Sequence, residues 1–574
     1  GGVECSINRV NDTFFSQMDH SGHISRLDDL DMIKELGINT LRYPVLWEHI
    51  APKGLKRADW SWADERLYKL KELGINPVVG FVHHGSGPEY TSLIDPDFGK
   101  KLAEYAFAVA DRYPWLQMFT PVNEPLTTAR FSGLYGLWYP HGKDDSTFVH
   151  CFVNQMQGVI EAMKAIRAVI PDAKLVQTED MGKVFSTPKL KYQADFENER
   201  RWLTYDFLMG KFGPWHKLWD YFIQKGKVAK RLDYFMENKC EPAITGLNYY
   251  VTSERFLDEN THLYPRHMRG GNGKHRYVDI EAVRVRREGL FGLGNIVREA
   301  AKRYNNAEIA ITEVHLGCTR EEQIRWLKDT YQACIALKSE GINLKAMTIW
   351  SLLGAYNWNV LLTKDVGHYE PGAFDTRSEK PRITALGRFV KSLTAETPQL
   401  PDHIATPGWW KRDERLIFMK NEFATNDKKI KRFSGLKPVL ITGATGTLGR
   451  AFAKICEIRN IPYKLLNRGD MNITDPASIE SALEKFQPWA VINATGYVRV
   501  DEAEVEVDKC MQVNAFGAIA LAEACKNVGI KVVTFSSDLV FDGASKKPYI
   551  ESNPMKPLNI YGLSKKEAEE KITA

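Results

Sequence analysis

Two glutamates end apolar, β-rich segments at positions where their side chains could act as a pair. Glu124 ends the segment Thr120–Glu124, and Glu313 ends the segment Ile311–Glu313. Cleavage of a glycosidic bond needs one carboxylic acid to protonate the leaving oxygen and one carboxylate to attack the sugar, ~5 Å apart in the retaining geometry. Different surroundings would separate their pKa values and assign the two roles. Each glutamate taken alone also fits a solvated loop residue.

A glycine-rich turn near residue 443 has the context of a dinucleotide-binding loop. The run Val439–Gly449 reads as a buried strand, a turn and a helix start. Glycines at such a turn let the backbone approach a pyrophosphate, and the helix N-terminus supplies amide donors. The loop residues predicted to bind the cofactor are Gly443, Thr445, Gly446, Leu448 and Gly449.

The residue after the next strand indicates which cofactor is bound. Arg468 follows Tyr463–Asn467, at the place where an acidic residue would bind a free ribose hydroxyl. An arginine there favours the 2′-phosphate of NADP, with NAD as the alternative cofactor. An exposed arginine without a role is the other interpretation.

A tyrosine and a lysine near the C-terminus could complete a reductase site. Tyr561 and Lys565 are four residues apart and share one helix face. A nearby ammonium is expected to lower the pKa of the phenol, which can then give a proton to a carbonyl as hydride arrives. Ser537 ends a strand and could hold the carbonyl oxygen.

The elements that must position the two glutamates form a repeated α/β pattern. The predicted strands are Gly2–Ser6, Thr40–Trp47, Pro77–His83, Met118–Asn123, Lys174–Thr178, Ala243–Tyr250, Glu308–Thr312 and Ala346–Leu352. Eight such strands separated by helical patterns predict a (β/α)8 TIM barrel, whose active site is built at the C-terminal strand ends.

The pattern of the chain changes after the eighth unit. Prolines and charged residues follow residue 394, and a second α/β pattern begins at Lys437. We therefore expect a barrel over 1–393, a linker over 394–436 and a Rossmann-type doubly wound parallel sheet over 437–574.

The composition excludes several classes of protein. The net charge is +5, and the densest basic run, Lys428–Arg432, is short, so nucleic acid is not an expected partner. No apolar run reaches the ~20 residues of a membrane span, and no signal peptide is visible. The eight cysteines show no disulfide or zinc spacing, which predicts a reducing cytoplasm and no metal site.

The first domain resembles glycoside hydrolase family 1 over residues 1 to about 393. Thr120–Pro125 is similar to the family's T-x-N-E-P signature, Ile311–Glu313 to its I-T-E signature, Gly246–Tyr250 to its G-x-N-Y-Y strand and Trp350–Leu353 to its W-S-L strand. The resemblance implies that Glu124 is the acid/base and Glu313 the nucleophile.

The same resemblance implies roles for residues around the two glutamates. Arg42 and Tyr250 would hydrogen-bond the nucleophile, while His84 and Asn123 would bind the glycone. For Arg42, an ion pair at the bottom of the barrel is the alternative. Among the aromatic residues that could stack on a sugar, Trp350 at a strand end is favoured over Trp138 and Trp358, which also fit packing residues.

Two departures from the family pattern concern sugar recognition. Tyr356-Asn357-Trp358 stands where the family has F-E-W, so Asn357 replaces a glutamate that grips two sugar hydroxyls. The loop His84–Pro88 replaces H-W-D-L-P. Because charge-assisted hydrogen bonds are stronger than neutral ones, we expect weakened or redirected glycone recognition with intact chemistry.

Residues 437–574 resemble the short-chain dehydrogenase/reductase superfamily and, within it, the dTDP-4-dehydrorhamnose reductases. The match includes Asn493-Ala494, implied to contact the cofactor, as well as Ser536–Gly543 and Tyr549–Glu551. Ser537 stands where this family usually has threonine. The resemblance implies reduction of a 4-keto sugar nucleotide. In the family about as much chain again follows, so a partial reductase domain is expected.

Two hypotheses for the whole chain come from different classes. The first is a bifunctional enzyme that joins a retaining glycosidase to an NAD(P)H-dependent sugar-nucleotide reductase, with a glycoside and a sugar nucleotide as small-molecule partners. The second is a non-hydrolytic carbohydrate-binding barrel that regulates or scaffolds the reductase. A purely structural C-terminal domain and a homo-oligomeric assembly remain open alternatives.

Overall fold

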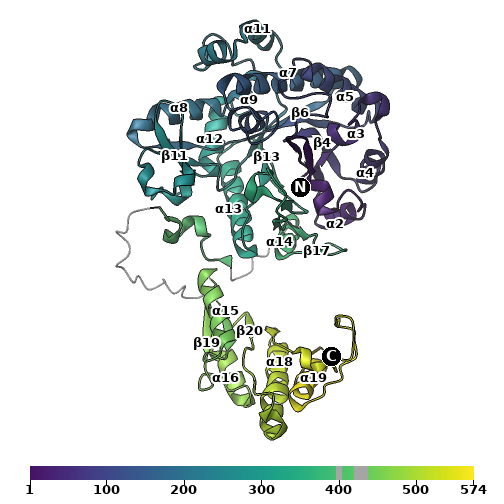
Figure 1. Cartoon of the computed structure of the whole chain (residues 1–574), viewed down its shortest axis with the longest axis vertical. Helices are drawn as coiled ribbons and strands as arrows, with labels where there is room; N and C mark the ends of the chain where they lie inside the picture. Colours follow the sequence, from purple (N-terminus) through teal and green to yellow (C-terminus); the bar gives the residue numbers. More distant parts are fainter. Residues whose placement is uncertain (396–403, 419–436, 460, 574) are drawn as a thin grey trace. The chain divides into compact units, whose positions relative to one another are not determined.

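The computed structural model describes residues 1–395, 404–418, 437–459 and 461–573. Contacts divide the chain into two compact units. The first contains residues 1–395 and 408–418 of the described chain, and the second contains the C-terminal part. Each unit has its own core and is described separately (Figure 1).

A parallel sheet forms the wall of the first unit. Its strands, in spatial order, are β13 (Leu344–Ile349), β12 (Ile309–Val314), β8 (Ile244–Asn248), β6 (Lys174–Asp180), β5 (Met118–Asn123), β4 (Asn76–His83) and β3 (Thr40–Pro44). Strands such as β12 are apolar and buried along their whole length, as expected where helices cover the outer face.

The N-terminal residues close this sheet into a barrel. The Arg42 amide of β3 donates to the Gly1 carbonyl at 2.9 Å, and the Gly2 amide donates to the Ile349 carbonyl of β13 at 3.1 Å. The predicted first strand, Gly2–Ser6, is therefore reduced to one bridge at Gly2. A side chain is excluded there, because a Cβ atom would lie 2.5 Å from the Trp350 ring.

Helices surround the barrel strands (Figure 1). They include α2 (Asp29–Glu35), α4 (Ser61–Glu72), α5 (Phe98–Arg112), α7 (Asp145–Val169), α9 (Leu203–Leu208), α12 (Leu293–Arg303), α13 (Arg320–Ser339) and α14 (Ala385–Thr394). Asp144 caps α7 by accepting from the Thr147 amide, and Thr384 caps α14 in the same way.

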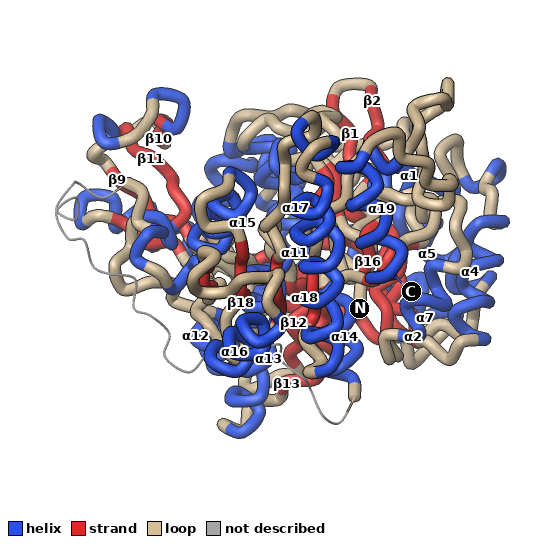
Figure 2. Tube along the Cα trace, turned by 90° about the horizontal axis from the view of Figure 1, so that it is seen from below, coloured by secondary structure: helices blue, strands red, loops and turns tan. Residues whose placement is uncertain are grey.

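Insertions after the strands build the surroundings of the barrel mouth. A small sheet of β10 (Arg269–Gly271), β11 (Arg276–Glu281), β9 (Arg255–Asp258) and β7 (Val184–Ser186) lies to one side with α8 (Lys191–Arg200) (Figures 1 and 2). Shorter elements include β1 (Ile7–Val10), β2 (Thr13–Ser16), α1 (Gln17–Ser21), α3 (Trp47–Ile50), α6 (Pro125–Ala129), α10 (Trp219–Tyr221), α11 (Ala229–Glu237), β14 (Ala355–Tyr356), β15 (Tyr369–Glu370), β16 (Phe374–Asp375) and β17 (Arg382–Ile383).

Part of the expected linker packs on the barrel instead. Arg412 forms an ion pair with Glu322 of α13, and Arg415 donates to the Val283 carbonyl at 2.9 Å. The linker predicted over 394–436 therefore does not hold for residues 408–418. Its prolines and charged residues suggested a linker, but the arginines satisfy a buried carboxylate and loop carbonyls of the barrel. Residues 419–436 lie outside the described residues.

The second unit contains a parallel sheet in the order β19 (Tyr463–Leu466), β18 (Val439–Thr442), β20 (Ala490–Ile492) and β21 (Lys531–Val533). Leu440 belongs to one hydrophobic core, while Val439 and Ile441 belong to another, because alternate side chains of β18 face opposite sides. The helices are α15 (Thr447–Ile458), α16 (Pro476–Phe486), α17 (Val507–Met511), α18 (Gly517–Asn527) and α19 (Ile560–Thr573). This is the predicted Rossmann-type architecture.

Candidate active sites

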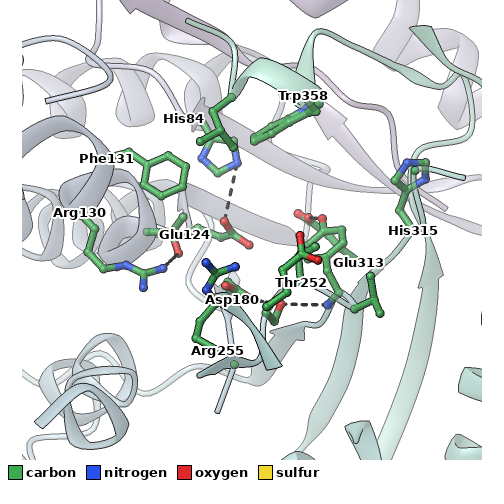
Figure 3. A pocket seen from close by; sticks show the side chains of 18 of the residues that line it. His84, Glu124, Arg130, Phe131, Asp180, Thr252, Arg255, Glu313, His315 and Trp358 are labelled. Carbon is green, nitrogen blue, oxygen red and sulfur yellow. Dashed lines mark hydrogen bonds and ion pairs between the residues drawn. The ribbon is translucent and has the colours of Figure 1, made fainter. Parts of the chain in front are cut away.

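The ends of β5 and β12 bring Glu124 and Glu313 into one pocket of about 740 Å³. Figure 3 shows both carboxylates pointing toward the same space, with His84 and Trp358 beside them. Both side chains are almost fully buried. The sequence-predicted pair is thus brought together at the carboxyl ends of the strands, where barrel enzymes build their sites.

The surroundings of Glu313 suit a charged carboxylate. Arg42 lies 2.7 Å from Glu313 Oε1, and the Tyr250 hydroxyl donates to Oε2. Burial raises the pKa of Glu313, while the Arg42 cation and the Tyr250 hydrogen bond oppose that rise. Arg42 also donates to the Thr312 carbonyl at 2.9 Å and to Asn123 Oδ1 at 2.5 Å. It therefore serves the site and is not an ion pair at the barrel bottom.

The surroundings of Glu124 suit a protonated carboxyl. Burial raises the pKa of Glu124 well above the usual range, and the negative charge of Glu313 is the second cause of this rise. Asn248 Nδ2 donates to Glu124 Oε1 at 2.5 Å, and His84 Nε2 lies 3.7 Å from the other oxygen. Burial lowers the pKa of His84 to about 3, so this imidazole is neutral at pH 7. Among the described residues no Arg or Lys forms an ion pair with Glu124, which therefore keeps its proton more firmly than Glu313.

This difference predicts the pH dependence of glycoside cleavage. Glu124 has the raised pKa, so kcat/KM should fall as pH rises through that pKa and the acid loses its proton. Glu124→Gln should lack this alkaline limb on an aryl glycoside whose leaving group needs no protonation, whereas the parent should show it on an alkyl glycoside whose leaving group does. The measurement is a pH profile of kcat/KM for both proteins, and an unchanged alkaline limb in the variant would assign the limb to another group.

Other predicted glycone residues divide into two groups. Trp350 and His84 line the pocket. Asn123 is buried behind it, because its Oδ1 accepts from Arg42 and from Thr178, and its Nδ2 lies 3.2 Å from His83 Nε2. Asn123 therefore holds the Arg42 guanidinium in place, and its sugar contact remains a prediction.

Asn357 is not brought into the pocket. Its Nδ2 donates to Asp365 at 2.8 Å, and its Oδ1 accepts from the amides of Val366 and His368. The side chain is buried and ties its own loop together. The neighbouring Trp358 lines the pocket instead. The position predicted to grip sugar hydroxyls thus has a structural role here.

The sequence analysis did not predict a third carboxyl of the pocket, that of Glu4. Glu4 is buried, lines the pocket with Glu313, and accepts from the Ser6 amide and hydroxyl. Burial raises its pKa. Its position inside the predicted first strand was a usable signal, because residues alternate between the inside and outside of a barrel. Arg130, Asp180 and Arg255 form a further charged wall (Figure 3).

One group of potential metal ligands occurs among the described residues, away from the pocket. Glu199, Asp206 and His216 lie close together. Arg303 approaches Glu199 at 2.9 Å and Asp206 at 2.6 Å, so a guanidinium already pairs with both carboxylates. This group fits a buried ion-pair network better than a metal site.

The glycine turn of the second unit has the geometry of a phosphate-binding loop. Gly443 has φ of +80°, and the Gly446 amide donates to its carbonyl at 3.0 Å before α15 begins. Thr445 and Leu448 are exposed at this helix start. A Cβ atom on Gly449 would lie 2.3 Å from the Gly443 carbonyl oxygen, so only glycine fits that close approach.

The remaining predicted cofactor residues differ in their surroundings. Arg468 is exposed and has no hydrogen bond or ion pair with the part of the chain that the structure describes. Asn493 is buried, accepts from the Thr442 hydroxyl at 3.0 Å and donates to Thr534 at 3.2 Å. It ties β18 to the residues after β21, and the adjacent Ala494 lies against the glycine turn.

The expected activation of Tyr561 is not present. Burial is the main cause that raises the pKa of the Tyr561 phenol, and the hydrogen bond with Ser537 only partly opposes this rise. Lys565 Nζ lies 5.8 Å from the Tyr561 ring centroid and donates to the Phe535 carbonyl at 3.1 Å. The expected lowering was wrong for this structure, because the ammonium is directed to a backbone carbonyl. Ser537, Tyr561 and Lys565 are nevertheless brought near one another.

A closed parallel barrel with two buried carboxyls at its mouth defines a glycosidase of the TIM-barrel class. Residues 18–393 match Glycosyl hydrolase family 1. The chain belongs to this family. A family 1 β-glucosidase from Thermotoga maritima shares the fold, with a TM-score of 0.54 and 19% identity, covering 65% of this chain and 86% of that chain.

The second unit has its own relatives. Residues 437–574 match the RmlD substrate binding domain. A dTDP-4-dehydrorhamnose reductase of Streptomyces griseus is 38% identical over 133 residues, 23% of this chain and 44% of that protein. A reductase of the same name from Aggregatibacter actinomycetemcomitans is 39% identical over 133 residues and covered to 45%. The chain thus spans about half the length of these curated relatives. Both matched families are families of enzymes.

Proposed function

We propose that the barrel is a retaining glycosidase in which Glu313 attacks the anomeric carbon and Glu124 protonates the leaving oxygen. The contrast between the two carboxyls carries this assignment. Glu313 pairs with Arg42 and accepts from Tyr250, whereas Glu124 is buried and pairs with no Arg or Lys among the described residues. After the covalent glycosyl-enzyme forms, Glu124 takes a proton from water, and the hydroxide oxygen displaces Glu313.

The test is mass spectrometry of the whole chain after incubation with a panel of activated 2-deoxy-2-fluoro glycosides. The fluorine slows the second step, so a covalent sugar should accumulate on Glu313. The sugar that reacts would identify the glycone. A folded protein that forms no adduct with any member of the panel would contradict the assignment.

For the second unit we propose binding of NADPH and reduction of a 4-keto sugar nucleotide by the complete protein. The exposed Arg468 after β19 supports NADP over NAD, because a 2′-phosphate needs a cation at that point. Titration of the chain with NADPH and NADH tests this proposal. Equal affinity for both, or tighter NADH binding, would contradict the role of Arg468.

One observation favours a second candidate, a barrel that binds carbohydrate without cleaving it. Asn357 does not reach the pocket, so a family contact to the sugar is missing. The buried pair of carboxyls argues against this candidate, since a binding module needs no separated acid and nucleophile. A disaccharide that binds but yields no product and no adduct would favour it.

The proposed location is the cytoplasm. All eight cysteines are free, and seven of them are buried, as in proteins of a reducing compartment. None of the helices among the described residues is long and apolar enough to cross a membrane.

A further inference from the structure

The segment that follows the barrel contributes a side chain to the catalytic pocket. Trp409 lines the same pocket as Glu124 and Glu313, although the match to the glycosidase family ends at residue 393. This tryptophan is partly exposed, whereas both glutamates are almost fully buried. Trp409 therefore lies toward the open side of the pocket, and the reacting carboxyls lie in its deep part.

The segment is firmly attached at this position. The Trp409 amide donates to Glu322 Oε2 at 3.0 Å, and Arg412 pairs with the other oxygen of the same carboxylate. Glu322 lies in the first turn of α13, the helix that follows β12 and Glu313. Trp410 Nε1 donates to Asp329 of α13 at 3.2 Å. These contacts fix Trp409 relative to the strand that carries the nucleophile.

The surroundings of the indole are those of a ligand-binding surface. The Arg284 guanidinium lies 4.1 Å from the centroid of the Trp409 ring, and Arg284 also lines the pocket. His315 and Glu370, 2.9 Å apart, line the same pocket. An aromatic face with polar groups around it is the arrangement that orients a ring-shaped ligand.

We propose that Trp409 belongs to the binding site for the leaving group, and that this group is a second sugar ring. The deep part of the pocket, with Glu4, Glu313 and Trp350, takes the sugar that is attacked, so the outer part must take what leaves. A volume of about 740 Å³ accommodates more than one ring. This inference rests on the glycosidase proposed above and specifies its substrates as disaccharides or longer glycosides.

The experiment measures binding by calorimetry, so that it does not depend on turnover. The full chain carrying Glu124→Gln is titrated with cellobiose and lactose, and with methyl β-glucoside and methyl β-galactoside as their one-ring counterparts. Trp409→Ala in this background should weaken disaccharide binding about three- to tenfold, the usual contribution of an aromatic contact, and leave the one-ring ligands unchanged. Trp409→Phe should retain most of the affinity.

Two further variants separate a local contact from a general loss of structure. Arg412→Ala, which releases the segment from Glu322, should weaken the disaccharides in the same way. Trp215→Ala is the matched control, because this tryptophan is 71% exposed and does not line the pocket. Equal weakening of one-ring and two-ring ligands, or no effect of Trp409→Ala, would overturn the inference.

Other outcomes also decide between the proposals. If no disaccharide binds while Trp409 is intact, or if disaccharides bind no more tightly than the methyl glycosides, the leaving-group site is wrong. If the disaccharide effect is found but no fluorosugar adduct forms on Glu313, Trp409 binds a second sugar ring, but the catalytic proposal fails and that ring is not a leaving group.

Discussion

Replacing Glu313 with glycine should lower kcat on an activated aryl glycoside by at least about 10⁴-fold. The substitution removes the attacking carboxylate, and it leaves Arg42 with an uncompensated buried charge. Neither Glu124 nor Glu4 is expected to take over the role, because burial raises the pKa of Glu124 well above its usual range and Glu4 accepts from Ser6. Steady-state kinetics with a nitrophenyl glycoside of the reactive sugar measures the loss.

Added azide provides the internal control for this prediction. In Glu313→Gly, azide can occupy the vacated space and attack once, so the glycosyl azide should have inverted configuration. In Glu124→Gly, Glu313 still forms the glycosyl-enzyme and azide then displaces it, so two inversions retain the configuration. A loss smaller than tenfold, or azides of the same configuration from both variants, would show that the roles are assigned wrongly.

A substitution in the glycine turn of the second unit should cause a large loss of NADPH affinity. Gly449→Ala places a Cβ atom 2.3 Å from the Gly443 carbonyl oxygen and 2.9 Å from that of Thr442. These are backbone atoms, so the turn must move, at a cost of about 1–3 kcal/mol. NADPH affinity should fall about ten- to a hundredfold or be lost. Fluorescence titration with NADPH measures the change.

A neighbouring glycine gives the matched control. The nearest atom to a Cβ on Gly446 is 3.5 Å away, and its φ of −86° suits any residue. Gly446→Ala should therefore keep the thermal stability of the unit, whereas Gly449→Ala should lower it. Both variants should cleave aryl glycosides like the parent. Unchanged NADPH binding in Gly449→Ala would mean that this turn does not hold the cofactor.

The sequence predicted that Glu124 and Glu313 would lie together because their positions depend on local features. Glu124 follows one buried strand and Glu313 lies near the end of another, and parallel strands in a barrel end at one face, so the pattern alone brings them together. The glycine turn was predictable for the same reason, since strand, turn and helix are contiguous between Val439 and Ile458.

Other residues have surroundings that the sequence did not predict, because their contacts are not contained in local sequence patterns. Asn357 turns into its own loop because Asp365, Val366 and His368 satisfy its amide. Lys565 faces the Phe535 carbonyl, which is thirty residues away, so the pKa of Tyr561 is set by burial. The attachment of residues 408–418 depends on Glu322, a partner that is distant in the sequence.

The contacts of Arg42 constrain how the sugar preference of this family member can evolve. One guanidinium serves the nucleophile, Asn123 and the Thr312 carbonyl, so a substitution at any of these positions alters the surroundings of the others. Their effects are expected to be non-additive. New sugar preferences should therefore arise more readily at pocket positions that do not contact Arg42 than through this epistatic centre.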